Sequence, residues 1–292
     1  MHIPWDDVAV FVAVADTGST ARAAKRLRMS QPTVSRRVAQ LEERLGVVLF
    51  ERRVTGASPT AVGERLLEPA RRMAEWAGEL ERAAPGADHR PRGVVRITAP
   101  PGVAWELLAP LAGLLQKELP LVRLEVQARV QYADLARREA DLALRTRAPT
   151  QRDLVEIERL EFDVDAFATP ELIARLPRKP KLTDIPFIAW APPFEAMVPN
   201  PQLEQLIPGF TPVFASDDYL VQLRAAEAGV GAMFLGDVRH RFAPRSTLKR
   251  LKLELGAHAR GSIHLVAARS ALDVARVRAV ADILAREMRR VR

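Results

Sequence analysis

The segment from Ala84 to Gly93 divides this chain into two regions with different patterns of predicted secondary structure. It reads Ala-Pro-Gly-Ala-Asp-His-Arg-Pro-Arg-Gly, and its two prolines and two glycines interrupt every helical or strand period. The pattern before it is almost entirely helical. After it, helical stretches alternate with six short β-type runs, which are Val94–Thr98, Val122–Val126, Asp141–Arg145, Val164–Ala168, Val213–Ala215 and Ile263–Ala268. The 292 residues are enough for two domains with separate cores. The sequence therefore predicts a helical N-terminal domain followed by a doubly wound α/β domain.

Three helices with short connections are predicted near the N-terminus. Asp6 to Asp16 places Val8, Phe11 and Val12 on one face, and Thr17-Gly-Ser19 ends that helix. A second short helix runs to Leu27, and Ser30 caps a third that runs to about Leu45. A short helix followed by a tight turn and a longer helix is the order of a helix-turn-helix unit.

The third helix has two chemically different faces. Val34, Val38, Leu41 and Leu45 form one apolar stripe, and the opposite face carries Gln, Ser, Thr and Arg side chains near its start. The acidic pair Glu42-Glu43 lies at the far end. These polar side chains can reach base edges and phosphates, so the pattern favours a helix that enters the DNA major groove.

Positive charge is concentrated on this region. The chain holds 44 basic and 36 acidic residues, a net charge of +8, and residues 22–53 contain nine basic against three acidic residues. A local surplus on one motif favours phosphate contact. The alternative reading is a solvated basic face on an ordinary helical bundle.

Several segments in order closely resemble the N-terminal domain of the LysR-type transcriptional regulators. They are Phe11-Val-Ala-Val-Ala-Asp-Thr-Gly-Ser19, Ala23-Ala-Lys-Arg-Leu27, Ser30-Gln-Pro-Thr-Val-Ser-Arg36, Leu41-Glu-Glu-Arg-Leu-Gly46 and Leu49-Phe-Glu-Arg52. The resemblance implies a winged helix-turn-helix DNA-binding domain over residues 1–60. It departs from the family at Ser58-Pro-Thr-Ala-Val-Gly63, so the wing formed by residues 46–60 is expected to pack differently. The implied DNA-binding residues are Ser30, Gln31, Thr33, Ser35, Arg36, Arg37, Arg52, Arg53 and Thr60.

Residues 61–83 resemble the family's long linker helix, followed by a hinge at 84–92. The apolar stripe of this helix is Val62, Leu66, Met73, Ala77 and Leu80, with Trp76 beside it. The stripe either pairs with the same helix of a second subunit or packs back on its own domain. Pro69 removes one backbone hydrogen bond and predicts a kink near residues 65–69.

Residues 93–292 resemble, more weakly, the family's effector-binding domain. The implied fold is a two-lobed, periplasmic-binding-protein-like α/β domain, with lobe one at about 93–162 and 269–292 and lobe two at about 163–268. Its ligand lies between the lobes, near strand ends and helix N-termini. The expected effector-binding residues are Thr98, Pro100, Gly102, Val103, Arg129, Arg145, Trp190 and Phe194.

The residues expected in that cleft are compatible with more than one kind of ligand. Pro100 and Pro101 have no N–H to offer an anion, and the family's usual Ser or Thr is missing there. Arg129 and Arg145 either supply guanidinium groups for an organic acid or are ordinary solvent-exposed arginines. Trp190 and Phe194 either line the cleft or fill a core.

Other classes of function are disfavoured. The chain has no cysteine, the five histidines have no metal-ligand spacing, and no Gly-x-Ser-x-Gly or Walker pattern occurs, so we expect no catalytic residues, no metal and no cofactor. We expect no signal peptide or membrane span and a cytoplasmic location. The predicted function is a homodimeric or homotetrameric regulator that binds an interrupted palindrome in double-stranded DNA and responds to a small-molecule effector. A constitutive DNA-binding protein with an α/β oligomerisation platform remains the alternative.

Overall fold

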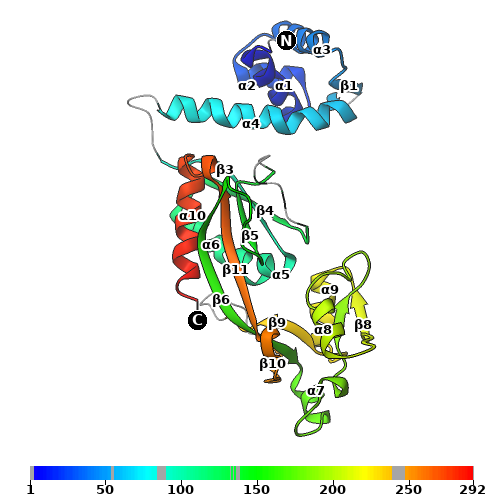
Figure 1. The fold of residues 1–292 in the computed structure, drawn as a ribbon. Coiled ribbons are helices and arrows are strands. Elements are labelled where there is room, and N and C mark those ends of the chain that lie inside the picture. Colours follow the sequence, from blue (N-terminus) through cyan, green and yellow to red (C-terminus); the bar gives the residue numbers. More distant parts are fainter. Residues whose placement is uncertain are drawn as a thin grey trace. The chain divides into compact units, whose positions relative to one another are not determined.

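A computed structural model of the chain describes residues 3–53, 56–83, 90–131, 133, 135, 139–238 and 247–291. It divides into two compact units, Met1–Arg90 and Pro91–Arg292 (Figure 1). Most of the predicted hinge, residues 84–89, lies outside the described residues. Of the helices that are described, none combines the length and apolarity needed to cross a membrane.

The first unit contains the three predicted helices, α1 (Trp5–Thr17), α2 (Thr20–Leu27) and α3 (Gln31–Leu45). Gly18 ends α1 with φ of 62°, a left-handed conformation that glycine adopts without steric cost. The hydroxyl of Ser19 caps α2 by accepting a hydrogen bond from the Arg22 N–H, and Ser30 does the same for α3 through Thr33. The local capping residues thus confirm the predicted helix boundaries to within a residue or two.

The wing is a small hairpin of β1 (Phe50–Arg53) and β2 (Gly56–Pro59), which pair antiparallel and lead into α4 (Ala61–Ala83). Gly56 lies so close to α1 that a Cβ there would be 2.2 Å from the carbonyl oxygen of Gly18. The neighbouring Ala57 N–H donates to the same oxygen at 2.9 Å. Close backbone approach therefore fixes the wing against the end of α1 and excludes any side chain at position 56.

A core between α1, α3 and the first half of α4 holds the first unit together. Phe11, Leu41 and Leu49 are fully buried there, and Leu67 and Ala70 of α4 join the same cluster. The helix continues without interruption through Pro69. The proline removes one backbone hydrogen bond but does not end the helix, because the flanking residues are fixed by packing on α1.

The second unit is built on a mixed sheet with strand order β10-β6-β11-β5-β3-β4, in which β9 also pairs with β6. β3 pairs parallel with β4 and β5, whereas β11 pairs antiparallel with β5 and β6. Its strands are β3 (Gly93–Ala99), β4 (Val122–Ala128), β5 (Leu142–Arg145), β6 (Leu154–Ala168), β9 (Met233–Gly236), β10 (Lys249–Arg250) and β11 (Arg260–Ala268).

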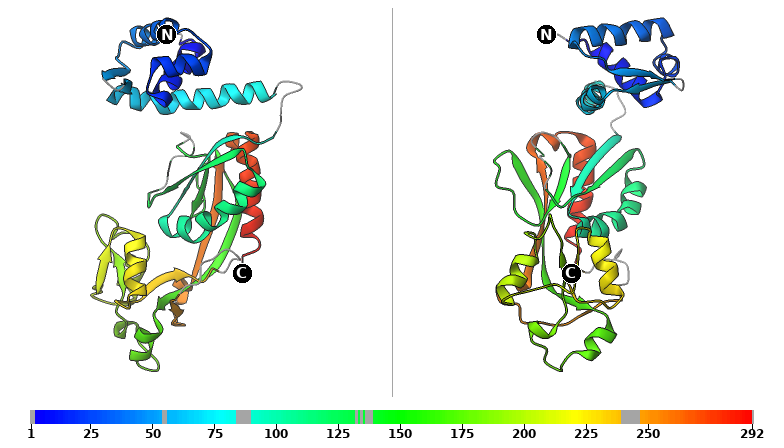
Figure 2. Two further views of the ribbon diagram at one scale, coloured as in Figure 1. Left: turned by 180° about the vertical axis from the view of Figure 1, so that it is seen from behind. Right: turned by 90° about the vertical axis from the view of Figure 1, so that its right-hand side faces the viewer.

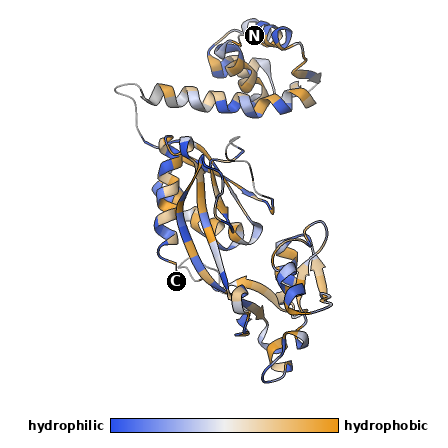
Figure 3. Cartoon of the chain, in the orientation of Figure 1, coloured by the Kyte–Doolittle hydropathy of each residue, from blue (hydrophilic) through white to orange (hydrophobic). Residues whose placement is uncertain are grey.

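Helices cover this sheet and bury its apolar residues. α10 (Ala275–Met288) lies along the sheet beside β6 and β3 (Figure 2). A second helical segment after β3 comprises α5 (Pro101–Val103), a π-helical turn η1 (Ala104–Leu108) and α6 (Ala109–Glu118). Apolar and polar residues alternate along α10 in Figure 3, as expected for a helix with one face on a sheet. Together these elements form the largest core of the protein.

Most of the remaining elements gather around the far end of β6 and form the second lobe. A separate parallel pair, β7 with β8, adjoins β9 through a bridge between Phe187 and Ala232. Phe187 lies at the centre of this lobe's core, stacked on Phe234. The other elements are α7 (Pro170–Arg175), η2 (Leu182–Asp184), β7 (Ile188–Trp190), α8 (Asn200–Leu206), β8 (Phe214–Ser216), α9 (Tyr219–Glu227), η3 (Gly256–Ala259) and η4 (Arg269–Ala271), of which η4 joins the core of the first lobe through Ala271.

Two strands differ from the sequence prediction. The predicted strand Val164–Ala168 is only the end of β6, which spans 15 residues from Leu154 and runs from one lobe into the other. The sequence places residues 163–268 in the second lobe, but the structure packs β11 into the sheet and core of the first. Charged residues of β6, such as Glu156 and Arg159, form polar contacts on one face of the sheet. Because these residues are not apolar, the first part of β6 does not show the sequence pattern typical of a buried strand.

Candidate functional site

The exposed face of α3 carries the side chains expected to meet DNA. Gln31, Ser35 and Arg36 are exposed, while Val34 and Val38 on the opposite face are buried. Within the described residues no carboxylate pairs with Arg36, so its guanidinium is available to an external acceptor. The surface is polar and basic where the helix begins, as groove entry requires.

Other predicted contact residues on α3 have roles within the fold. The Ser30 hydroxyl accepts from the Thr33 N–H at 3.3 Å and lies 2.7 Å from the Thr33 hydroxyl, so this pair fixes the start of the helix. Arg37 contacts both Asp6 and Asp7 of α1 at 3.2 Å. Because the Asp7 carboxylate is buried, Arg37 is held as its counter-ion. Arg36 and Arg37 are adjacent in sequence and have different surroundings.

Of the three contact residues predicted in the wing, only Thr60 has a described side chain. Arg52 and Arg53 lie in β1 opposite Ala57 and Gly56, and their side chains lie outside the described part of the structure. The Thr60 hydroxyl donates to the carbonyl oxygen of Val48 at 2.7 Å and accepts the Gly63 N–H at 3.0 Å. Thr60 therefore caps α4 and anchors it to the wing.

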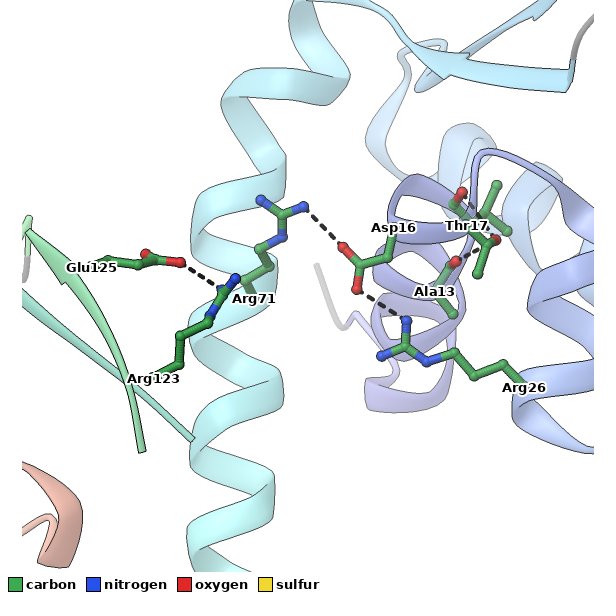
Figure 4. Close-up of polar contacts among 8 residues, drawn as sticks. Ala13, Asp16, Thr17, Arg26, Arg71, Arg123 and Glu125 are labelled. Carbon is green, nitrogen blue, oxygen red and sulfur yellow. Dashed lines mark hydrogen bonds and ion pairs between the residues drawn. The ribbon is translucent and has the colours of Figure 1, made fainter. Parts of the chain in front are cut away.

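A polar contact that the sequence did not indicate joins α1, α2 and α4. Asp16 pairs with Arg26 at 3.2 Å and with Arg71 at 2.9 Å (Figure 4). The three side chains are partly exposed, so each pair contributes little stability. The pairs have a clearer effect on surface charge, because the single carboxylate of Asp16 partly compensates the charges of two arginines. The separate Arg123–Glu125 pair in Figure 4 lies within β4.

The second half of α4 exposes large apolar side chains. Met73 is 43%, Trp76 41% and Leu80 76% exposed, and their spacing places them along one face. The first half of the same helix is packed on its own unit through Leu67 and Ala70. The first half of the helix therefore packs back on its own unit, whereas the second half presents an exposed apolar face.

The second unit contains a cleft of about 1040 Å³ between the end of β3 and the elements of the second lobe. Its walls are largely aromatic and aliphatic, with a few charged groups. The aromatic side chains that line it are Trp105, Phe162, Phe167, Trp190, Tyr219 and Phe234. A concave, mostly apolar site of this size accommodates a small organic molecule.

Tyr219 closes one side of the cleft against the loop after β3. Its ring packs on Gly102, where an added Cβ would lie 2.9 Å from Tyr219 Cε2. The hydroxyl is buried, and burial together with the carboxylates of Glu106 and Glu227 raises its pKa. Tyr219 therefore remains a neutral phenol in the cleft.

Two carboxylates also line the cleft, those of Glu106 and Glu227. Burial raises the pKa of Glu106, and the nearby charge of Glu227 raises it further. Glu227 pairs with Arg224 at 2.6 Å, but that guanidinium is 83% exposed. The folded protein thus disfavours the charged form of Glu106.

Arg250, which lines the cleft, is held by three aspartates. Arg250 Nε lies 2.7 Å from Asp165, and its Nη1 lies 3.2 Å from Asp237 and 3.6 Å from Asp163. Asp165 is fully buried and also accepts the Leu253 N–H at 3.1 Å. The hydrogen bond with Asp165 is the main cause of the raised pKa of Arg250. The network joins β6, β9 and β10 at the floor of the second lobe.

The structure brings together half of the predicted effector residues. Pro100, Gly102, Val103 and Trp190 line the cleft. Thr98 is buried in β3, and Phe194 packs edge-on against Trp190 without lining the cavity. Two predicted guanidinium groups lie elsewhere.

Arg129 is exposed at the end of β4, and neither it nor Arg145 lines the cleft. Arg145 is 5% exposed and donates to the carbonyl oxygen of Ala133 at 2.8 Å, so it supports the chain behind the sheet. The sequence prediction placed both in the effector site because basic residues follow strand ends there. It missed Glu106, Tyr219 and Arg250, because each lies on an element whose position depends on the two lobes meeting.

Both units match known protein families. Residues 5–64 match the family described as bacterial regulatory helix-turn-helix protein, lysR family, and residues 88–289 match the LysR substrate binding domain. The two matches together extend over most of the chain.

Among curated relatives, an HTH-type transcriptional regulator of Xanthomonas campestris pv. campestris (strain 8004) is 34% identical over 170 residues, 58% of this chain and 49% of that protein. CrgA of Neisseria meningitidis serogroup C (strain 8013) is 32% identical over 58% of this chain and 57% of its own length. The aligned chain thus spans about half the length of these two relatives. The Mau operon transcriptional activator of Paracoccus denitrificans is 31% identical over 80% of this chain and 79% of that protein.

Two solved structures share the fold of this chain. CrgA from Neisseria meningitidis, a LysR-type transcriptional regulator, has a TM-score of 0.56 at 25% identity, over 98% of this chain and 99% of that one. Full-length CbnR in complex with its target DNA has a TM-score of 0.61 at 20% identity, over 98% and 100%, and shares the fold. The order of elements agrees with both family matches: a capped helix-turn-helix with a wing comes first, followed by a long helix and a two-lobed α/β unit. The chain therefore belongs to the LysR family of bacterial regulatory helix-turn-helix proteins.

Proposed function

We propose that this protein is a DNA-binding transcriptional regulator whose activity is controlled by a small molecule bound in the cleft of its second unit. The observation that carries the proposal is the exposed polar face of α3, with Arg36 uncommitted among the described residues above a buried apolar stripe. Such a face supplies hydrogen-bond donors and acceptors for base edges in the major groove. Among the described residues, no cluster supports a catalytic function better than this face supports DNA binding.

The target is an interrupted palindrome in double-stranded DNA, read by a homodimer. Support for a dimer comes from the exposed apolar face of Met73, Trp76 and Leu80 on α4, which an identical helix would cover. Two symmetric reading units require two half-sites about one helical turn apart, or a multiple of it. A homotetramer is a further expectation from the family.

The effector proposal rests on the size and lining of the cleft. A cavity of about 1040 Å³ with aromatic walls favours a sensor over a constitutive DNA-binding protein with an oligomerisation platform. An organic acid is the class expected from Arg129 and Arg145. Because neither residue lines the cleft, the proposal extends here to a small organic molecule only. A cytoplasmic site of action suits a chain without cysteine that acts on DNA.

Nuclease footprinting of the full-length protein on the DNA upstream of its own gene, at near-physiological salt, tests this function. A protected interrupted palindrome, with half-sites at helical-turn spacing, would support a dimeric reader. Protection spread evenly along the DNA and lost with modest salt would contradict sequence-specific reading. Thermal unfolding across a library of metabolites tests the sensor, since any ligand of the folded state raises the unfolding temperature.

A further inference from the structure

We propose that an exposed basic segment of the second lobe, residues 175–181, contacts the phosphate backbone of DNA without reading its sequence. The basic segment adds a DNA contact in the second unit to that of α3 in the first. This inference rests on the proposed function, because it assigns a further surface to a protein that binds DNA. Its test needs no knowledge of the target sequence.

The basic segment runs from the last residue of α7 to the residue before η2, and the lobe holds both of its ends. The Thr169 hydroxyl caps α7, and the Asp184 carboxylate accepts the Lys181 N–H at 2.9 Å. Leu176 and Leu182 pack against the buried cluster of this lobe. In Figure 1, α7 lies at the end of the second unit opposite β3. The fold therefore fixes the basic segment at the extremity of the lobe.

The charged side chains of the basic segment are all cations, namely Arg175, Arg178, Lys179 and Lys181. All four are exposed. Within the part of the chain that the structure describes, none of them forms an ion pair. Pro177 and Pro180 restrict the backbone between them, which lowers the entropy lost when the cations meet a partner.

Several exposed arginines elsewhere in the second unit are paired instead. Arg159 contacts Glu161 at 2.6 Å, and Arg260 contacts Asp163 at 3.0 Å. The protein itself compensates the charge of these arginines. The charge of the basic segment is left for an external anion.

The composition of the basic segment favours a phosphate backbone over an acidic protein. A specific protein interface combines charge with an apolar core. Leu176 packs into the lobe, so Pro177 is the exposed residue of the segment that carries no charge. Phosphate contact requires cations alone, and duplex DNA carries one negative charge per about 1.7 Å of its axis.

The salt dependence of binding to random duplex DNA tests the contact. The patch variant combines Arg175→Gln, Arg178→Gln, Lys179→Gln and Lys181→Gln. Fluorescence anisotropy measures the affinity of the full-length wild type and variant for a random duplex of about 60 base pairs, between about 50 and 200 mM salt. Each phosphate contact contributes about 0.9 to the slope of log K against log salt concentration, so the slope should fall by about 2 to 4. Affinity at the lower salt should fall about tenfold or more.

A matched variant separates a local contact from a general loss of charge. It combines Lys117→Gln, Arg147→Gln, Arg152→Gln and Arg278→Gln, which remove four exposed cations from α6, the connection between β5 and β6, and α10. Its slope should change by less than about 1, because dispersed charges neutralise no common run of phosphates. Both variants should keep the unfolding temperature of the wild type, since all the replaced side chains are exposed.

Lysine acetylation gives a local readout of the same contact. Random DNA at low salt should protect Lys179 and Lys181 from an amine-reactive reagent by about threefold or more, because a bound phosphate covers the amine. Lys117, which is exposed on α6, should keep its reactivity. Mass spectrometry of the labelled peptides measures both.

Three results would overturn the inference: an unchanged salt slope in the patch variant, an equal loss in the matched variant, or no protection of Lys179 and Lys181. Failure of the proposed function looks different. If the wild type protects no interrupted palindrome but the patch variant loses salt dependence, the basic segment stands and sequence-specific regulation fails. A palindromic footprint with an unchanged slope would retain the regulator and reject the contact.

Discussion

The two units use arginine in opposite ways. On α3, Arg36 is exposed with no carboxylate partner among the described residues, whereas Arg250 in the second unit is held by three aspartates. Both residues contribute equally to the net charge of +8. The difference shows that a count of basic residues does not locate a nucleic-acid surface; the positions of the carboxylates decide which arginines are available.

The largest effect is expected from Arg250→Met, which removes the counter-ion of the buried Asp165. We expect a loss of ~3 kcal/mol in the free energy of unfolding, because a buried charge remains with only backbone donors. Chemical denaturation measures it. The double variant with Asp165→Asn should recover most of the loss. A change below about 1 kcal/mol would show that the network is solvated and that the aspartates hold Arg250 only weakly, which would contradict the contrast with Arg36.

Arg36→Ala tests the other side of the comparison. If the guanidinium reads a base, specific DNA binding should weaken by ~1 to 3 kcal/mol while binding to random DNA changes little. Fluorescence anisotropy on both DNAs measures the difference. Arg278→Ala on the exposed side of α10 removes the same charge from the second unit and is the control. Equal losses on both DNAs would assign Arg36 to phosphate contact.

Arg37→Ala should act on stability instead of recognition. Asp7 is buried, so losing its guanidinium partner should lower the free energy of unfolding by about 1 to 2 kcal/mol. Thermal unfolding of the single variant and of the double variant with Asp7→Asn measures the coupling between them. A loss of sequence preference at unchanged stability would place Arg37 beside Arg36 as a base reader and remove the contrast between them.

Asp16→Asn should leave stability nearly unchanged, by less than about 1 kcal/mol, since both of its ion pairs are partly exposed. Release of Arg26 and Arg71 should instead raise affinity for random DNA and steepen its dependence on salt. A salt titration of binding checks this. Adding Arg71→Gln should reverse part of the gain, and an unchanged salt slope would show that these arginines do not reach phosphates.

The smallest effect concerns Glu106. Its folded-state pKa lies above the ordinary value of 4.5, so the folded protein binds this proton more tightly than the unfolded chain. Stability therefore falls as pH rises from that value through the folded-state pKa. Glu106→Gln should stabilise the ligand-free protein at neutral pH by about 0.5 kcal/mol or less and have no effect below the ordinary pKa. A destabilised variant at neutral pH would mean that the charged carboxylate is favourably bound.

The sequence alone determined the helix-turn-helix, because its information is local. Ser19, Gly18 and Ser30 set the ends of helices through contacts within a few residues, and the stripe of Val34, Val38 and Leu41 follows directly from the helical period. The six predicted β-type runs all lie within or overlap observed strands for the same reason. Charge surplus pointed to the correct motif but could not separate Arg36 from Arg37.

Only the tertiary structure decided the composition of the cleft and the partners of its charges. Glu106, Tyr219 and Arg250 come from three distant segments that meet because β6 crosses between the lobes and because β11 pairs with it in the first. Arg145 follows a strand end as a ligand-binding arginine would, yet it faces Ala133 behind the sheet. Long-range packing chooses which side of an element meets a cavity, and no local period in the sequence records that choice.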